Sequence, residues 1–413
     1  MPNLEEGAGP EDYLAYAALN NPGLEAAFHR WRAALERVPQ AEAPPEPRLT
    51  YAYFIREVET RVGPQQHRLG LSQRLPWFGK LDLRGRAARE AAESARQHYE
   101  ARKLGLFYAV RDAYFEHYYV NEAIGLVRAQ RDLLEYLEGV VRARYRTAQA
   151  AHADLVRAQV ELASMEDRLQ ALRELAAPVA ARLNAALNRP LEAELPVPGE
   201  LPHERIAAPD AEVLRWVAEG NPDLRALAHE AARRADEVRL ARKDFWPDLT
   251  VGVDWVQTGD PIADTRDAGK DPIIAMVSVN LPIWREKLNA RVREAGARRL
   301  AILRESKERE NDLLARARMV LYEVRDAERR VDLYENVLMP KTRQSLKASE
   351  AAYRTGAGTF LDLVEAARVL LEFALARQRA ITDHAQRLAE LEMLAGRAVP
   401  RAATAALREG EKP

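Results

Sequence analysis

The sequence contains no cysteine, which excludes disulfide bonds, thiolate metal sites and a cysteine-linked lipid anchor in the chain as given. No apolar run comes near the roughly 18 residues that a membrane-spanning helix needs. The 62 basic and 63 acidic side chains leave a formal net charge of -1, so the chain has no electrostatic footprint for nucleic acid. Residues 1–20 are acidic and lack a basic end before an apolar core, so no export signal is visible.

Patterns of catalytic and metal-binding residues are also missing. No two of the eight histidines have the three- or four-residue spacing of metal ligands on a helix. The glycines in residues 356–358 follow no strand, so they do not form a phosphate-binding loop. We therefore expect no enzymatic activity, no cofactor and no metal site. His117 lies on an apolar stripe, and we expect it to be packed in a helix contact.

What the sequence does contain is one plan repeated after about 200 residues. The matching segments are Asn21-Pro22 with Asn221-Pro222, Leu75-Pro76 with Leu281-Pro282, and Tyr145-Arg146-Thr147 with Tyr353-Arg354-Thr355. In the last pair the offset is 208 positions, and Asp154-Leu155-Val156 recurs at the same offset as Asp362-Leu363-Val364. The proline-rich residues 190–209 separate the copies and predict a linker. The chain is therefore one duplicated unit.

Each copy predicts unusually long helices. No proline occurs between Pro76 and Pro178, and residues 80–147 are rich in Ala, Arg, Glu and Leu, which favour helix. At about 1.5 Å per residue, such a helix is ~100 Å long. Apolar residues in the second copy step by alternating four and three positions, the period of a coiled-coil seam, and the same steps recur in the first copy at an offset of 207. The second-copy stripe is Leu313, Ala317, Val320, Val324, Ala327, Val331, Tyr334 and Leu338.

Four short segments have a period of two instead. Apolar residues alternate with Gly, Ser, Asn, Asp, Thr or Arg in residues 49–55, 69–75, 249–255 and 273–281, which predicts two strand hairpins. A half-buried soluble sheet has this pattern, and so do strands that face lipid on one side and water on the other. We favour lipid because no second layer is available to cover the apolar side. An open edge is not tolerated in lipid, so the chain must then oligomerise.

These features together resemble TolC-type outer-membrane efflux channels, especially the CusC- and CzcC-like branch that exports heavy metals. The resemblance covers roughly residues 10–400. It rests on the doubled plan, on the Asn-Pro helix starts, and on residues 75–80 with their partner 281–284. Its most specific part is residues 353–366, where Tyr353, Gly356, Thr359 and Asp362 follow a Tyr-x-x-Gly-x-x-Thr-x-x-Asp pattern.

The resemblance implies a fold, a location and partners. The expected fold is mainly helical, a long coiled-coil α-helical barrel plus a transmembrane β-barrel that is completed by trimerisation, with four strands per protomer. The homotrimer would lie in outer-membrane lipid with its helices in the periplasm. Its expected partners are a periplasmic adaptor protein and an RND-type inner-membrane pump. It would be a passive duct for metal cations or small toxic compounds and would bind no nucleic acid.

The resemblance also assigns site residues. Acidic residues just past the second helix-to-helix turn would ring the closed entrance; by motif position these are Asp362 and Glu365. Their first-copy counterparts are Asp154 and Arg157, so the two turns cannot be equivalent electrostatically. Asp362 has an alternative role, which is to cap the returning helix. The turns themselves would form the periplasmic tip and dock the adaptor, through Tyr145, Arg146, Thr147, Tyr353, Arg354, Thr355, Gly356, Gly358 and Thr359.

The resulting division of the chain alternates helical and strand segments. We expect an N-terminal helical segment (10–47), a first hairpin (48–76), a first long-helix pair (77–190, turn near 148–153), a linker and helix (191–246), a second hairpin (247–283), a second long-helix pair (284–398, turn near 356–361) and a tail (399–413). The remaining alternative is a soluble or periplasmic coiled-coil spacer protein with a small β-sheet.

Overall fold

The computed structural model describes residue 4 and residues 8–201, 204–260, 266–267 and 269–403. The chain divides into two compact units, and each unit takes segments from both copies of the repeat. Unit 1 comprises Met1–Ala27, Tyr99–Leu224 and Arg309–Pro413, and unit 2 comprises Phe28–His98 and Arg225–Glu308. The duplication therefore does not separate into one domain per copy.

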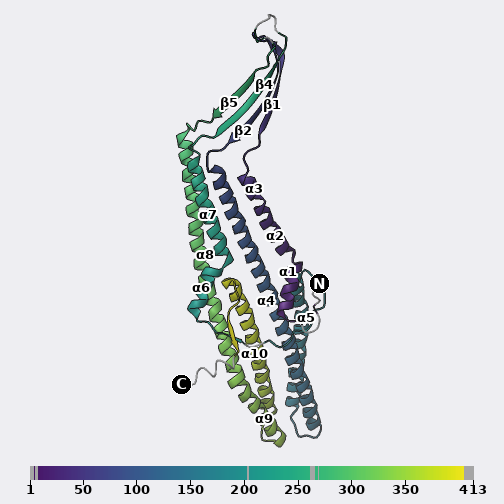
Figure 1. Ribbon diagram of the computed structural model, residues 1–413. Coiled ribbons are helices and arrows are strands. Elements are labelled where there is room, and N and C mark those ends of the chain that lie inside the picture. Colours follow the sequence, from purple (N-terminus) through teal and green to yellow (C-terminus); the bar gives the residue numbers. More distant parts are fainter. Residues whose placement is uncertain (1–3, 5–7, 202–203, 261–265, 268, 404–413) are drawn as a thin grey trace. The chain divides into compact units, whose positions relative to one another are not determined.

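Helices account for most of the described residues (Figure 1). They are α1 (Pro10–Asn20), α2 (Pro22–Leu35), α3 (Arg37–Glu42), α4 (Lys80–Arg146), α5 (His152–Leu187), α6 (Asp210–Gly220), α7 (Pro222–Lys243), α8 (Arg285–Leu333), α9 (Met339–Thr355) and α10 (Phe360–Ala395). The 67 residues of α4 confirm the long helix predicted from the proline gap. Within the described part of the chain, no helix combines the length and apolarity needed to cross a membrane.

The two Asn-Pro segments make equivalent contacts in unit 1. The Asn21 side-chain oxygen accepts a hydrogen bond from the Leu24 amide at 3.0 Å, and the Asn221 oxygen accepts one from the Asp223 amide at 2.9 Å. Each asparagine also donates from its Nδ2 to a carbonyl near the end of a long helix, that of Ala186 or Leu394, at 3.0 Å. The Asn-Pro helix starts are confirmed, with each asparagine as the cap. The repeat extends to tertiary contacts, because the two carbonyls are 208 positions apart.

The predicted heptad stripe is buried over most of its length. In the second copy, the stripe residues from Leu313 to Val331 are at most 3% exposed, and in the first copy His117 is buried as expected. Burial lowers the pKa of His117, so a neutral ring is favoured. The stripe prediction is wrong at its end: Tyr334–Leu338 form a π-helix, η1, between α8 and α9. The wider turn of a π-helix changes the register, so Tyr334 and Leu338 are only partly buried.

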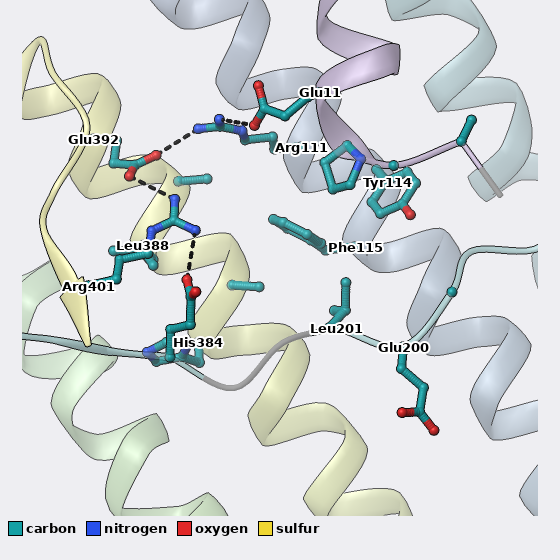
Figure 2. Close-up of a pocket in the computed structure, with 17 residues that line it drawn as sticks. Glu11, Arg111, Tyr114, Phe115, Glu200, Leu201, His384, Leu388, Glu392 and Arg401 are labelled. Carbon is teal, nitrogen blue, oxygen red and sulfur yellow. Dashed lines mark hydrogen bonds and ion pairs between the residues drawn. The ribbon is translucent and has the colours of Figure 1, made fainter. Parts of the chain in front are cut away.

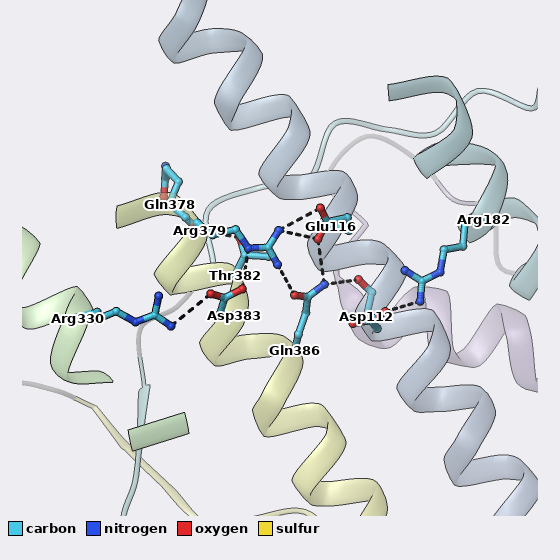
Figure 3. Close-up of polar contacts among 9 residues, drawn as sticks. All are labelled: Asp112, Glu116, Arg182, Arg330, Gln378, Arg379, Thr382, Asp383 and Gln386. Atoms are coloured by element: carbon cyan, nitrogen blue, oxygen red, sulfur yellow. Dashed lines mark hydrogen bonds and ion pairs between the residues drawn. The ribbon is translucent and has the colours of Figure 1, made fainter. Parts of the chain in front are cut away.

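Polar contacts also hold the helices of unit 1 together (Figure 3). The Arg379 guanidinium on α10 donates to both carboxylate oxygens of Glu116 on α4, at 2.8 and 3.0 Å, and to Asp383 at 2.6 Å. Gln386 on α10 donates to the Asp112 carbonyl on α4 at 3.1 Å. Burial opposes the charge of Arg379, but hydrogen bonds to Glu116 and Asp383 raise its pKa above the ordinary value. This network joins a helix of the first copy to a helix of the second.

Unit 2 contains a four-stranded antiparallel sheet in the order β1-β2-β4-β5 (Figure 1). Its strands are β1 (Arg48–Val58), β2 (Gln65–Leu75), β4 (Leu249–Thr258) and β5 (Ile273–Val279). The register places the predicted apolar residues on one face, with rows such as Leu49, Leu71, Val253 and Ala275. The alternation prediction is confirmed, except that Leu281 lies beyond the end of β5.

The linker and the tail contain a short sheet that the sequence patterns did not predict. Strand β3 (Glu204–Ile206) lies in the expected linker and pairs antiparallel with β6 (Arg401–Ala403) in the expected tail. Three residues are too few to show a period, so neither strand could be recognised from alternation. The pairing fastens the end of the second copy to the connection between the copies.

Candidate functional site

The predicted site residues gather at the two helix-to-helix turns of unit 1. The first turn, residues 147–151, joins α4 to α5, and the second, residues 356–359, joins α9 to α10. Both turns contain a residue in the left-handed backbone region at equivalent positions, Ala148 with φ 58° and Gly356 with φ 76°. The two turns therefore have a similar backbone conformation, although the residue at the left-handed position differs.

The second turn is built from residues suited to it. Gly356 adopts its positive φ without the clash that a Cβ brings. Thr359 and Asp362 form a capping box at the start of α10: the Thr359 hydroxyl accepts from the Asp362 amide at 3.2 Å, and Asp362 accepts from the Thr359 amide at 3.0 Å. The Thr359 hydroxyl and amide lower the pKa of Asp362. The alternative that Asp362 caps the returning helix is confirmed.

The first turn lacks these devices. Ala148 occupies the left-handed position where the second turn has glycine. The residue before α5 is Ala151, which has no side chain that could cap, and the Asp154 amide bonds to the Ala151 carbonyl at 3.1 Å instead. Asp154 therefore does not form the capping box that its counterpart Asp362 forms.

The aromatic residues that flank the second turn are also more deeply buried than those that flank the first. Tyr353 and Phe360 are 8% and 1% exposed, and their ring centroids lie 5.7 Å apart in a core cluster with Leu363 and Val364. The equivalent pair in the first turn is Tyr145 and His152, with centroids 5.5 Å apart, but Tyr145 is 42% exposed. The second turn is anchored in a core, and the first lies at its margin.

Arg144 links the two turns, and sequence reasoning missed it. Its guanidinium lies 4.6 Å from the centroid of the Tyr353 ring and donates to the Tyr353 carbonyl at 3.2 Å. A second bond, at 3.4 Å, reaches the Arg354 carbonyl. The counterpart of Arg144 in the second copy is Ala352, so the link has no symmetric partner. The sequence signal for this link is the residue before the repeated Tyr-Arg-Thr motif, which is a charged arginine in the first copy and an alanine in the second.

The other predicted residues lie around these turns. Glu365 pairs with Arg368 at 2.6 Å, and Arg354 pairs with Glu350 at 2.5 Å, both on exposed helix faces. Arg146 and Arg157 are exposed. Asp362 and Glu365 share the wall of a groove of 410 Å³ between α9 and α10, with Lys341, Thr342, Ser345, Ser349, Ala366 and Val369. At Gly358 an added Cβ would lie 2.9 Å from that of Ala352, so the turn packs closely there.

Comparison with known proteins decides the family. A family model described as outer membrane efflux protein matches residues 14–189 and 213–397. The chain belongs to this family. The efflux protein is 24% identical to the pyoverdine export outer membrane protein OpmQ of Pseudomonas putida, over 88% of this chain and 81% of OpmQ.

Solved structures of similar proteins show the same fold. The outer membrane protein VceC of Vibrio cholerae is 18% identical, with a TM-score of 0.77 and coverage of 95% of this chain and 97% of VceC. CusC is 15% identical, with a TM-score of 0.81 and coverage of 96% of each chain. The fold is therefore that of the TolC-type channels, a helical barrel with a β part, and the efflux protein is a non-enzymatic outer-membrane channel of tripartite export systems. The comparisons support this family and no particular branch of it.

The efflux protein also contains a cavity of 300 Å³ in unit 1 (Figure 2). One wall carries a chain of ion pairs: Arg111 bonds to Glu392 at 2.6 Å and to Glu11 at 2.8 Å, and Arg401 bonds to Glu392 at 2.9 Å. Apolar and aromatic side chains line the rest of the cavity, among them Tyr114, Phe115, Leu201 and Leu388. Both guanidinium groups are paired with carboxylates. These ion pairs join α1, α4, α10 and β6 to one another.

Proposed function

We propose that this efflux protein works as a passive homotrimeric exit duct, in which three four-stranded sheets close one barrel in the outer membrane. The observation that carries the proposal is the sheet of unit 2. Its apolar face is uncovered, with Tyr51 63%, Ile273 73% and Val277 70% exposed. The other face is mixed: it carries the ion pair between Arg68 and Asp254 and the polar Thr50 and Ser72, but also Ile274 and Met276. Such a sheet fits lipid on one side and water on the other.

The sheet edges support closure by further copies. Strands β1 and β5 are the two edges, and within the described residues each pairs on one side only. Unpaired backbone groups are costly in hydrocarbon, so edge β1 of one copy must pair with edge β5 of the next. This argument favours the duct over the alternative of a soluble spacer, because a spacer leaves the apolar face and both edges in water.

The absence of cysteine makes this pairing directly testable. One cysteine replaces Ala52 in β1, and a second replaces Ile274, Ala275 or Met276 in β5, so that the three pairings sample three neighbouring registers. We expect at least one pairing to give a covalent trimer under oxidising conditions. The same β5 cysteines combined with Leu71→Cys on interior strand β2 are the matched control and should give none. A protein that stays monomeric without detergent and forms no cross-link would support the spacer.

We place the gate of the duct at the second turn. Three copies of Asp362 and Glu365 around an axis would form a ring of like charge that attracts cations. Glu365→Gln should weaken cation block of the single-channel current in a planar bilayer. Arg157→Gln, at the equivalent first-copy position, is the control and should leave the block unchanged. An unchanged block in Glu365→Gln and Asp362→Asn would remove both residues from the gate.

We place adaptor docking at the turns and the groove between α9 and α10. The groove is lined by small polar side chains and two carboxylates, a surface that a helical hairpin can enter. Ser345→Trp should fill the groove and lower adaptor affinity at least tenfold. Gln344→Trp, on the exposed neighbouring position outside the groove, should lower it less than threefold. Equal loss in both variants would move docking away from the groove.

The cargo we propose is a metal cation or a small toxic compound that an RND-type pump and a periplasmic adaptor deliver. The name of OpmQ points to pyoverdine export for that relative, which supports a small-molecule cargo. Export assays with each candidate pump, comparing loss of resistance to metal salts and to organic toxins on deletion of this chain, test the choice.

A further inference from the structure

One end of the sheet in unit 2 carries a dense cluster of aromatic side chains. Here β2 leads into α4, α7 leads into β4, and β5 leads into α8 (Figure 1). Trp77 and Trp246 stack with ring centroids 5.4 Å apart and an interplanar angle of 9°. Phe78 and Trp284 are 82% and 71% exposed. The exposed Leu281 and Ile283 continue the apolar face of the sheet to this point. We use the name rim for these four aromatic residues together with three cations, Lys243, Arg285 and Lys287.

The rim has a surplus of positive charge. Two carboxylates near it are already paired: Glu286 with Arg293 at 2.5 Å, and Asp244 with Arg291 at 3.4 Å. Asp248 is buried and pairs with Lys80 at 2.8 Å and with Arg74 at 2.5 Å.

Three further cations have no such partner. Lys243 donates to the Phe78 carbonyl at 2.8 Å, and Arg285 lies 5.6 Å from the centroid of the Phe245 ring. Lys287, two residues further along α8, is exposed. Among the described residues, no carboxylate forms an ion pair with these cations. The rim therefore presents uncompensated positive charge beside exposed aromatic rings.

The opposite end of the strands is different. There Arg61 pairs with Asp267 at 3.4 Å, and Lys270 pairs with the same carboxylate at 2.9 Å. Among the described residues, the surplus charge is thus found at the helical end of the sheet and not at both ends.

We infer that the rim binds anionic phospholipids of the leaflet on the helical side of the membrane. Their phosphates would lie at Arg285 and Lys287, and their upper acyl chains against Trp284 and Ile283. Tryptophan favours the boundary between hydrocarbon and headgroups, and cations near that boundary attract anionic lipid. The inference rests on the proposed membrane role of the sheet, since the rim is continuous with its apolar face. It adds a lipid preference to the duct.

The test measures lipids bound to the purified trimer by native mass spectrometry, during titration with phosphatidylglycerol or with zwitterionic phosphatidylethanolamine. The double variant Arg285→Gln/Lys287→Gln should bind phosphatidylglycerol roughly tenfold more weakly, because each cation near a membrane surface contributes about a fivefold factor at most. Its binding of phosphatidylethanolamine should change less than twofold. Trp284→Ala should weaken both lipids alike.

The matched control is Arg61→Gln/Lys270→Gln, which removes two cations at the opposite end of the strands. It should leave the lipid preference within twofold of the unsubstituted protein. In the unsubstituted protein, the preference for phosphatidylglycerol should also fall as salt is raised, since salt screens exposed charges.

Three results would overturn the inference. One is an unchanged preference for phosphatidylglycerol in Arg285→Gln/Lys287→Gln. Another is loss of the preference on adding inorganic phosphate at a concentration matched to the lipid, which would mark a site for free anions. The third is loss of the trimer in the same variant, which would make the rim an interface between copies. Failure of the duct itself is separate, because the unsubstituted chain would then form no trimer.

Discussion

The two helix-to-helix turns share the residues Tyr-Arg-Thr but are stabilised by different means. The second turn has glycine at its left-handed position, a capping box and a buried Phe360. The first turn has Ala148, no side-chain cap, and His152 at the position of Phe360. A repeated motif therefore preserves the path of the backbone while the local free energy of the two turns diverges.

This difference indicates which turn opens first on local unfolding. Local opening is easiest where few apolar contacts and few satisfied end groups hold the chain. By that criterion the first turn opens at a lower free-energy cost than the second. The contacts of Arg144 with Tyr353 and Arg354 stabilise the first turn by attaching it to the second. Amide hydrogen exchange followed by mass spectrometry can report each turn separately, and substitutions can make the turns more alike or less alike.

Removal of the Phe360 ring should have the largest effect. Phe360→Ala leaves a cavity beneath the second turn and should lower the free energy of its local opening by about 3–5 kcal/mol. His152→Ala, at the equivalent position of the first turn, should change it by less than about 0.5 kcal/mol. Hydrogen exchange of residues 352–366 and 144–158 measures both. Equal effects at the two positions would contradict the difference in packing.

Loss of the link between the turns comes next. Arg144→Gln removes the contact with the Tyr353 ring and two hydrogen bonds to carbonyls, and should cost about 1–2 kcal/mol. Exchange should accelerate in both turns, since the link belongs to both. Arg146→Gln, two residues along and exposed, is the matched control and should be silent. Acceleration in the first turn alone would show that Arg144 acts within its own helix.

The capping box can be removed from one turn and introduced into the other. Thr359→Ala should destabilise the start of α10 by about 1 kcal/mol, the usual cost of losing a cap. Ala151→Thr should stabilise the start of α5 by up to about 1 kcal/mol, because Asp154 already stands at the position that completes the box. The measurement is exchange of the first-turn amides of each helix. No gain in Ala151→Thr would mean that the backbone there cannot adopt the capping geometry.

The left-handed positions should show a smaller effect of opposite sign. Ala148→Gly relieves the penalty on a Cβ in this region and should stabilise the first turn by about 0.5–1 kcal/mol. Gly356→Ala should destabilise the second turn by a similar amount, and because no atom lies within 4 Å of the added Cβ, the cost is confined to the backbone. If both substitutions stabilised their turns, Gly356 would not need the left-handed backbone conformation assigned to it.

The smallest effect concerns pH. The pKa of Asp362 is lowered in the folded protein, so its capping contribution is present above the unfolded pKa of about 3.9 and is lost as pH falls through the lower folded value. Between pH 7 and pH 5 the second turn should be unaffected, and below about pH 4 its opening should ease. Asp362→Asn should abolish this dependence. An NMR titration of the carboxyl group measures it, and a folded pKa above 3.9 would contradict the capping geometry.

Local rules were sufficient for much of the fold and for part of the site. The caps at Asn21 and Asn221, the uninterrupted α4 and the alternation of the strands each depend on neighbours within a few residues. The same holds for the cap formed by Asp362. The π-helix at Tyr334–Leu338, by contrast, falls within an unbroken apolar stripe, so periodicity alone predicted an ordinary helix there.

The sequence by itself determined what is decided over short distances: a duplicated chain, long helices, strands with one apolar face, and two turns of the same backbone path. Tertiary structure alone decided which distant segments meet. The pairing of β3 with β6, the contact of Arg144 with Tyr353 and the network around Arg379 join residues more than 190 positions apart. Their partners share no pattern along the chain, because a hydrogen bond or an ion pair requires only that folding bring two groups within reach.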